Sequence, residues 1–327
     1  MLEAFAVGNT LPEAYHAALI KLCDQGKKTD CLDWNTTQIE IGMTMHVVNP
    51  LEEPMISKCF IGGHRELEQY RLEMLDGILD FEVGLGNWAY TYHERYENQY
   101  NFVINELKRN PSSRRAVMMI RSVDDIGSND PACWQHAQYF IRNNKLDCMV
   151  MFRSNDACKA TFMNAFALIM LQKRIADELE IEVGTYTHRA NSFHCYEKDY
   201  ETLITYVERI RANNKKDLCF DYVGDWKDEM DDCREEILSD VQKMKDRYKI
   251  SDENDKSSKK LIDKNLKNST IKVLEQFQKD CKDWYSLEDL FVAMLCDYAS
   301  FGDTTPFPTF EKAENYAKEV LNENSIG

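Results

Sequence analysis

The chain has 327 residues, 43% of them hydrophobic, and a formal net charge of −16. That length suits one large folded domain or a domain with an appendage, and that hydrophobic share is enough for a buried core. The negative charge argues against an extended nucleic-acid-binding surface, because neutralising many phosphates requires a basic face.

The sequence also lacks signs of a membrane, secreted or metal-binding protein. It has no long apolar run of the kind that spans a bilayer, and we interpret its acidic N-terminus, MLEAFAVGNTLPEAYHAAL, as an amphipathic helix rather than a leader. Its 11 cysteines are scattered, without C-x-x-C pairs or histidines at zinc spacing. We therefore expect reduced cysteines, no bound metal and a cytoplasmic location, in a bacterium or a phage-infected host.

The first half of the chain mixes strand and helix patterns. Residues 36–48 and 54–60 are typical of short strands and are separated by the turn-forming NPLEEP. Residues 64–79 have apolar side chains at helical spacing, and residues 100–111 predict a second helix that ends at a proline.

The middle of the chain predicts the core. Three apolar runs, at residues 114–122, 146–154 and 181–196, are typical of buried strands, and residues 162–179 form a long apolar helical pattern between the last two. We therefore predict an α+β fold in which a β-sheet packs on a central buried helix.

The last third has a different composition. Residues 209–282 are rich in Lys, Asp and Glu and indicate a linker or an exposed helix, while residues 271–323 regain helical periodicity. We predict a catalytic domain at residues 1–208 and a charged, mostly helical C-terminal extension at residues 209–327.

Cys133 is the candidate nucleophile. It lies in NDPACWQHAQYF, directly after a turn-forming Asp-Pro and before an apolar segment, where a thiol can be exposed at the rim of a pocket. For any one cysteine, a place in the core is the commoner outcome. Cys133 stands out because of the polar groups predicted to lie near it.

Arginines follow or precede two of the predicted strands. Arg153 and Ser154 come directly after the apolar run MVMF, and an arginine there can hold a phosphate and favour a nearby thiolate. Arg114 and Arg115 open another strand and offer a second cationic pair. A surface turn and a solvated strand start are the alternatives.

Three further side chains have the right chemistry to bind a nucleoside. Asn164 interrupts the apolar helix, and a buried carboxamide can pair with O4 and N3–H of uracil. His194 and Tyr196 alternate in a strand, so they share one face and can bind a sugar hydroxyl. All three can equally be polar groups of the core.

These residues together resemble a known family. The ordered set R-R at 114–115, D-P-A-C at 130–133, R-S-N-D at 153–156, Asn164 and H-C-Y at 194–196 is similar to the thymidylate synthase superfamily. Within it, R-E-L-E-Q-Y, N-P-S-S-R-R and Q-Y-F-I-R look most like the phage deoxycytidylate hydroxymethylases. The resemblance covers roughly residues 36–205.

The resemblance implies a reaction and a homodimer. Cys133 would attack C6 of a pyrimidine nucleotide, so that C5 captures the one-carbon unit of 5,10-methylenetetrahydrofolate, the co-substrate. Arg153 and Ser154 would bind the 5′-phosphate. Arg114 and Arg115 would reach the same phosphate from the other subunit.

Other roles are implied in the same way. Asp156 would contact the folate, and His194 with Tyr196 would hold the sugar 3′-hydroxyl. Glu68 would order water and move protons. The aromatic segment that packs the folate is shortened here, so that Trp88 and, for the family tyrosine, Tyr90 are the candidates that remain.

The chain departs from the family pattern at several points. The usual Pro-Cys-His is Ala132-Cys133-Trp134, and an arginine of an early phosphate loop is missing, with Lys27 or Lys28 as the nearby substitutes. The closing C-terminal tail of thymidylate synthases is not recognisable, and a site that admits water favours hydroxymethyl over methyl transfer.

We therefore predict a pyrimidine nucleotide C5-hydroxymethyltransferase. Asn164 stands where the cytosine hydroxymethylases have Asp, which favours dUMP as substrate and leaves dCMP or CMP as the second choice. The alternatives are thymidylate synthesis, in which dUMP is methylated, and a catalytically idle relative that binds a nucleotide or RNA.

Overall fold

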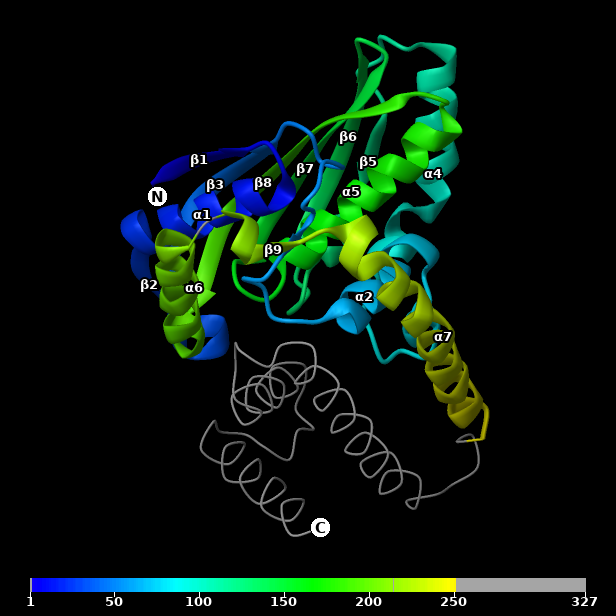
Figure 1. Ribbon diagram of the computed structural model, residues 1–327. Coiled ribbons are helices and arrows are strands. Elements are labelled where there is room, and N and C mark those ends of the chain that lie inside the picture. Colours follow the sequence, from blue (N-terminus) through cyan, green and yellow to red (C-terminus); the bar gives the residue numbers. More distant parts are fainter. Residues whose placement is uncertain (1, 214, 251–327) are drawn as a thin grey trace. The chain divides into compact units, whose positions relative to one another are not determined.

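A computed structural model describes residues 2–213 and 215–250 of the chain. Its centre is a mixed seven-stranded sheet of order β1-β3-β8-β7-β6-β5, with β2 attached to β3 (Figure 1). The pairs β1–β3 and β7–β8 are parallel and the other pairs are antiparallel. The strands are β1 (Glu3–Gly8), β2 (Lys27–Cys31), β3 (Thr36–Val47), β5 (Val117–Met119), β6 (Trp134–Arg142), β7 (Lys145–Asp156) and β8 (Glu182–Tyr196); β4 (Ile56–Ser57) pairs separately with β9 (Cys219–Phe220).

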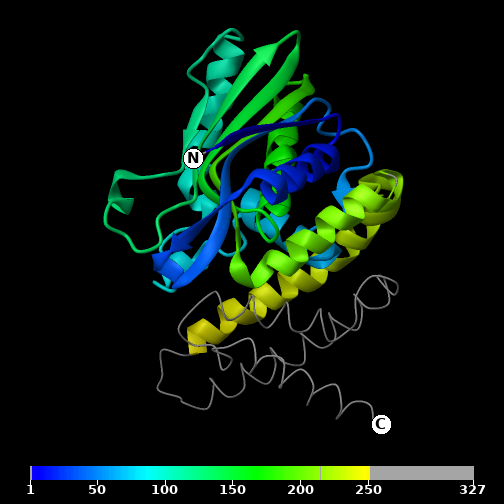
Figure 2. The same ribbon diagram turned by 90° about the vertical axis from the view of Figure 1, so that its left-hand side faces the viewer.

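Helices cover one face of this sheet, as the two perpendicular views show (Figures 1 and 2). The α-helices are α1 (Leu11–Gln25), α2 (His64–Asp76), α3 (Phe81–Gly84), α4 (Tyr92–Arg109), α5 (Thr161–Glu178), α6 (Tyr200–Ala212) and α7 (Lys227–Ile250). Single turns of 3-10 helix lie at Leu32–Trp34, Val123–Asp125, Glu197–Asp199 and Lys215–Leu218, and a π-helical turn lies at Tyr222–Trp226.

Helix α5 is the central buried helix that the sequence predicts. It packs on β7 and β8, and α1 and α4 lie on either side of it over the same face. Ala165, Leu168 and Leu171 have no exposed surface. The sheet, the apolar helix and their order confirm the predicted α+β fold.

The N-terminus differs from the expected helix. Residues Glu3–Gly8 form β1, and the helix begins only at Leu11. In β1, Phe5 and Val7 are exposed while Ala6 is buried, which is the two-residue alternation of a half-buried strand. Pairing with β3 and the proline in the first turn of α1 separate the strand from the helix.

The compact unit extends beyond residue 208, to Lys245. Strand β9 pairs with β4, and α7 packs Ile237 and Val241 against Leu72 of α2. The predicted helical pattern at residues 271–323 lies outside the described residues. The division into a catalytic domain at residues 1–208 and a charged, mostly helical extension at residues 209–327 stays a prediction.

None of the helices between residues 2 and 250 is both long and apolar enough to cross a membrane.

Candidate active site

The predicted site residues gather at one end of the sheet. Cys133 directly precedes β6, while Arg153 and Ser154 close β7 and His194 and Tyr196 close β8. The strand register brings them together, because Trp134 pairs with Phe152 and Asp156 pairs with His194. Antiparallel pairing of β6 with β7 therefore places the start of one strand beside the end of the other.

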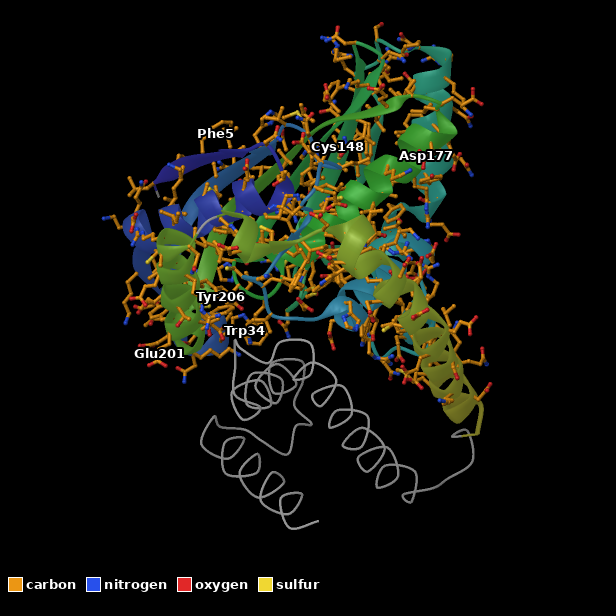
Figure 3. The ribbon with its side chains drawn as sticks, viewed as in Figure 1. Phe5, Trp34, Cys148, Asp177, Glu201 and Tyr206 are labelled. Carbon is orange, nitrogen blue, oxygen red and sulfur yellow. The ribbon has the colours of Figure 1, made fainter. Side chains whose placement is uncertain are left out.

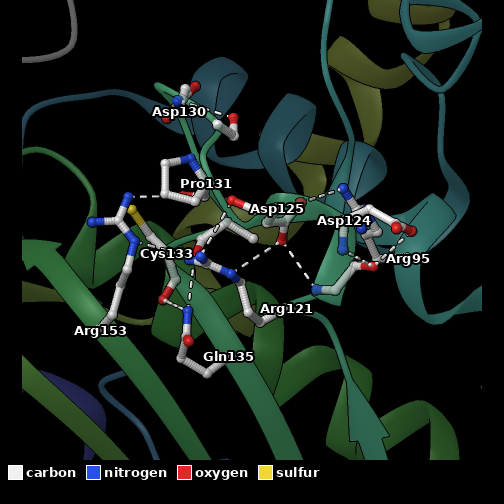
Figure 4. Close-up of polar contacts among 12 residues, drawn as sticks. Arg95, Arg121, Asp124, Asp125, Asp130, Pro131, Cys133, Gln135 and Arg153 are labelled. Carbon is white, nitrogen blue, oxygen red and sulfur yellow. Dashed lines mark hydrogen bonds and ion pairs between the residues drawn. The ribbon is translucent and has the colours of Figure 1, made fainter.

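Cys133 and Arg153 lie side by side (Figure 4). The Arg153 guanidinium donates to two carbonyls of the Cys133 loop, Pro131 O at 2.7 Å and Ala132 O at 3.3 Å. Burial raises the pKa of the Cys133 thiol, and the positive charge of Arg153 opposes that rise. The net effect is a raised pKa, so Arg153 offsets only part of the cost of burying a thiolate.

A buried ion-pair network anchors the segment that leads into Cys133. Asp125 is 4% exposed and accepts from Arg95 at 2.8 Å, and its other oxygen lies 3.4 Å from Arg121 (Figure 4). Arg121 also lies close enough to Cys133 to favour its thiolate. The network joins α4 to the loop that carries Cys133, so the position of Cys133 depends on contacts outside that loop.

Four tyrosines lie within electrostatic range of Cys133. Burial raises the pKa of each, and the negative charge of the Cys133 thiolate adds to the rise; they are Tyr70, Tyr90, Tyr92 and Tyr196. The predicted Tyr90 is thus close to the nucleophile. Tyr92 is also close, because its hydroxyl accepts from Trp134 N at 3.4 Å.

His194 presents an unsatisfied nitrogen. Its Nδ1 lies 3.3 Å from Ser154 Oγ and 3.2 Å from Ser192 O, and its ring is 4.7 Å from that of Tyr196. Its Nε2 is buried and has no hydrogen-bond partner among the described residues. Because a buried polar nitrogen rarely stays unpaired, this atom is available as a hydrogen-bonding group for a ligand.

Asn164 lies in the first turn of α5 and is 4% exposed. Its Oδ1 accepts a hydrogen bond from the hydroxyl of Tyr70, on α2. The predicted base-binding amide is therefore buried and already oriented by a protein partner.

Asp156 and Trp88, the predicted folate ligands, differ in how firmly they are held. Asp156 Oδ1 accepts from the backbone N–H groups of Cys158 and Lys159, both at 2.9 Å, which fixes the carboxylate at the end of β7. Trp88 lies before α4 and is 44% exposed.

The predicted proton carrier Glu68 is committed to ion pairs. It has no exposed surface as a residue, and its carboxylate accepts from Arg71 at 2.6 and 2.7 Å and from Arg234, on α7, at 2.7 Å. These contacts join α2 to α7. Proton transfer by Glu68 stays a prediction that its surroundings do not favour.

Arg114 and Arg115 lie at the other end of the sheet. Both are exposed and precede β5, in which Val117 pairs with Gln138 of β6. Gln138 is five residues beyond Cys133, which corresponds to roughly 15–17 Å of strand. Within one chain these two arginines are therefore remote from the thiol.

Sequence reasoning missed several residues of the site. Tyr70 contacts Asn164, and Tyr92 contacts the backbone of Trp134, next to Cys133. Near Tyr70 on α2, burial raises the pKa of Glu73 to about 7. His188 Nε2 lies 2.8 Å from Asn155 Oδ1, and burial lowers the pKa of His188 to about 3. In the sequence, polar residues within the patterns of α2, α4 and β8 are the signal that could reveal these side chains.

In residues 2–213 and 215–250, no three His, Cys, Asp or Glu side chains converge in a way that would hold a metal ion.

Comparison with known proteins identifies the family. The thymidylate synthase family model matches residues 71–240, which is more than half of the chain. The chain belongs to the thymidylate synthase family. The members of that family bind a nucleoside monophosphate, use methylenetetrahydrofolate as co-substrate and are typically dimers.

Individual relatives agree with this family assignment. A thymidylate synthase homologue from Methanocaldococcus jannaschii is 29% identical over 207 residues, which cover 60% of this chain and 93% of that protein. A homologue from Methanosarcina mazei is 32% identical over 54% of this chain and 83% of its own length. The thymidylate synthase of Bacillus licheniformis is 32% identical over 145 residues. That match covers 43% of this chain and 51% of that enzyme.

A solved structure supports the fold. Thermostable thymidylate synthase A from Bacillus subtilis superposes with a TM-score of 0.51 over 61% of this chain and 84% of that chain, at 18% sequence identity. The thymidylate synthase fold predicted from the sequence is thereby confirmed.

Proposed function

We propose that this chain transfers a one-carbon unit from methylenetetrahydrofolate to C5 of a pyrimidine nucleoside monophosphate, through a covalent adduct between Cys133 and C6. The observation that carries the proposal is one arrangement: a thiol beside Arg153, with the unpaired Nε2 of His194 and the buried amide of Asn164 at the same end of the sheet. A nucleotide needs contacts to phosphate, sugar and base, and these groups have that chemistry.

Each group has one proposed task. Arg153 and Ser154 bind the 5′-phosphate, His194 and Tyr196 the 3′-hydroxyl, and Asn164 the base. Adding the Cys133 sulfur to C6 breaks the ring conjugation and makes C5 a carbon nucleophile, which divides one difficult step into two easier ones. After C5 has taken the methylene group, loss of the C5 proton would expel tetrahydrofolate and leave an exocyclic methylene on the ring. Water would then add to that methylene, losing a proton, to give the hydroxymethyl group. The electron pair that this addition places on C5 and its carbonyl would re-form the C5–C6 double bond and expel the Cys133 sulfur.

Methylenetetrahydrofolate, the proposed co-substrate, would supply the one-carbon unit as a methylene group. Asp156, fixed by two backbone N–H groups, and the exposed ring of Trp88 are the proposed folate contacts. Tyr90, beside the thiol, is a proposed proton carrier, and proton transfer by Glu68 would require release of Arg234.

A second copy of the chain is proposed to complete the site. Arg114 and Arg115 are too far from Cys133 to share a phosphate with it inside one chain. The sheet face opposite the helices bears exposed Phe5, Val7 and Met149, and Figure 3 shows Phe5 at the outer edge of the sheet. Apolar residues exposed on an open sheet face are typical of a subunit interface.

Hydroxymethyl transfer to dUMP is the proposed reaction, with dCMP and CMP as second substrates. It rests on Asn164 and on the likeness to hydroxymethylases in the motifs of α2 and β6. Methylation of dUMP is the second candidate, because the relatives that match are named as thymidylate synthases.

Mass analysis of the product tests the proposal. The purified chain is incubated with methylenetetrahydrofolate and with dUMP, dCMP or CMP in turn. We expect dUMP to gain CH2O, whereas a gain of CH2 with release of dihydrofolate would replace hydroxymethyl transfer by methylation. Cys133→Ser should lower turnover about a thousandfold or more while nucleotide binding persists.

Cys233→Ser is the matched control, because Cys233 is a half-buried free thiol on α7. It should leave turnover unchanged. A wild-type chain that binds the nucleotides but modifies none of them would favour the catalytically idle relative.

A further inference from the structure

The orientation of the Asn164 side chain is set by a neighbour on another helix. Tyr70, on α2, donates its hydroxyl hydrogen to Asn164 Oδ1, on α5. Burial raises the pKa of Tyr70 far above its ordinary value, so its hydroxyl stays protonated and remains a donor. Asn164 itself is 4% exposed, so water competes little for this contact.

Turning the amide over would reverse this contact, because a phenol oxygen can also accept a hydrogen bond. The NH2 group of Asn164 would then donate to the Tyr70 oxygen, and the hydroxyl hydrogen would lose Asn164 Oδ1, its one hydrogen-bond acceptor among the described residues. A buried polar group left without a partner changes an equilibrium by about ten- to a hundredfold. The Tyr70 hydroxyl therefore favours one orientation of the carboxamide over the other.

Uracil and cytosine differ at the two positions that a carboxamide contacts. Uracil offers an acceptor oxygen at C4 and a donor at N3, whereas cytosine offers an amino donor at C4 and an acceptor at N3. A carboxamide in a fixed orientation complements one of these patterns. With the other base, its NH2 group faces a donor and its oxygen faces an acceptor. A carboxamide free to turn over would accept either base.

We propose that Tyr70 sets the base preference of the site by holding Asn164 in a single orientation. The inference rests on the proposed function, since it requires a pyrimidine at Asn164. Tyr70 is then a positioning residue, and the preferred base is uracil. Its hydroxyl affects which nucleotide binds far more than how fast a bound nucleotide reacts.

Binding of dUMP and of dCMP to the full chain, measured by calorimetry, tests this role. The variants are Tyr70→Phe and, as matched control, Tyr100→Phe, whose hydroxyl donates to Glu178 at 2.8 Å on the surface. We expect wild type and Tyr100→Phe to bind dUMP at least about tenfold more tightly than dCMP, a difference of about 1.4 kcal/mol. Tyr70→Phe should bring the two affinities within about threefold of each other, mainly by strengthening dCMP binding.

Asn164→Ala provides a second route to the same answer. If Tyr70 acts through the carboxamide, Tyr70→Phe should leave the affinity ratio of an Asn164→Ala chain unchanged. A Tyr70→Phe chain that keeps the wild-type ratio overturns the inference, and so does an equal effect of Tyr70→Phe with and without Asn164.

The outcomes also separate this inference from the proposed function. A wild-type chain that binds neither nucleotide contradicts the proposed function and the role of Tyr70 with it. A wild-type chain that binds both nucleotides alike contradicts only the role of Tyr70.

Discussion

Cys133 experiences two opposing effects. Burial raises its pKa and so disfavours the thiolate, which is the form that the proposed attack on a ring carbon requires, while the guanidiniums of Arg153 and Arg121 favour the thiolate. The negative charge of Asp130, three residues before Cys133, raises the pKa further. Because the net direction is upward, the thiolate is the minor form at neutral pH, and reactions that depend on it become faster as pH rises.

Arg153 can be tested through the thiol alone. Replacing it, as in Arg153→Met, removes the charge that favours the thiolate, so the pKa of Cys133 should rise further. Alkylation of Cys133 by iodoacetamide, followed by mass spectrometry between pH 6 and 10, should then have its midpoint at a higher pH. Arg142→Met, at the far end of β6, is the control and should leave the midpoint in place.

An unchanged midpoint would be equally informative. A midpoint that stays where it is in Arg153→Met, in a chain of unchanged melting temperature, would mean that Arg153 does not control the thiol and serves the phosphate alone.

The sequence could reveal the site residues that stand in short motifs. Cys133, Arg153, Ser154 and His194 were predicted together, and the register of β6, β7 and β8 brings them to one end of the sheet. Tyr70 could not be found in this way. Its role depends on the packing of α2 against α5, a contact between residues 94 positions apart, which no local pattern encodes.

Helix α2 contacts different helices with its opposite sides. Glu68 and Tyr70 are two residues apart, which places them about 200° apart around a helix of 3.6 residues per turn. Tyr70 accordingly faces Asn164 on α5, while Glu68 and Leu72, four residues apart, face α7. The position of Glu68 on the helix explains why it pairs with Arg234 on α7 rather than facing Asn164 on α5.

Glu68→Gln therefore tests a structural role against a catalytic one. The neutral amide leaves Arg71 and Arg234 without their charge partner; since Arg234 is 39% exposed, the loss should be about 2–3 kcal/mol rather than the larger cost of a fully buried pair. We expect a melting temperature lower by roughly 5–10 °C. Glu235→Gln, exposed on α7, is the control and should change it little.

Turnover in the same variants decides between the roles. If Glu68→Gln loses about a hundredfold or more in turnover while its melting temperature stays unchanged, Glu68 moves protons as the family resemblance implies.

Most of the elements that periodicity predicts over nearly their whole length are long. They include strands β3, β7 and β8 and helices α2 and α5, because each has enough residues to display its period. Helix α4 is predicted only from residue 100, whereas it begins at Tyr92. Strand β1 has six residues and lies directly before α1, so the sequence predicts a single helix over both. Strand β9 has two residues, and only its pairing with β4 makes it a strand.

At the scale of the whole molecule, the open sheet face is continuous from edge to edge. The strand registers define two rows of side chains across it: Phe5, Thr44, Arg189, Met151, His136 and Met119, and beside them Val7, His46, Thr187, Met149, Gln138 and Val117. Residues of one row share a face because paired residues point the same way. Six strands thus present a mixed apolar and polar surface that a second copy can cover.

Mixed dimers test whether two chains build each site. One chain carries Cys133→Ser and the other carries Arg114→Ala with Arg115→Ala; each alone should be nearly inactive. In an isologous dimer, a mixed pair would form one site with both defects and one with neither. Random mixing gives about half mixed dimers, so about a quarter of wild-type turnover should return. If the arginines act within their own chain, every site in the mixture carries a defect and no turnover returns.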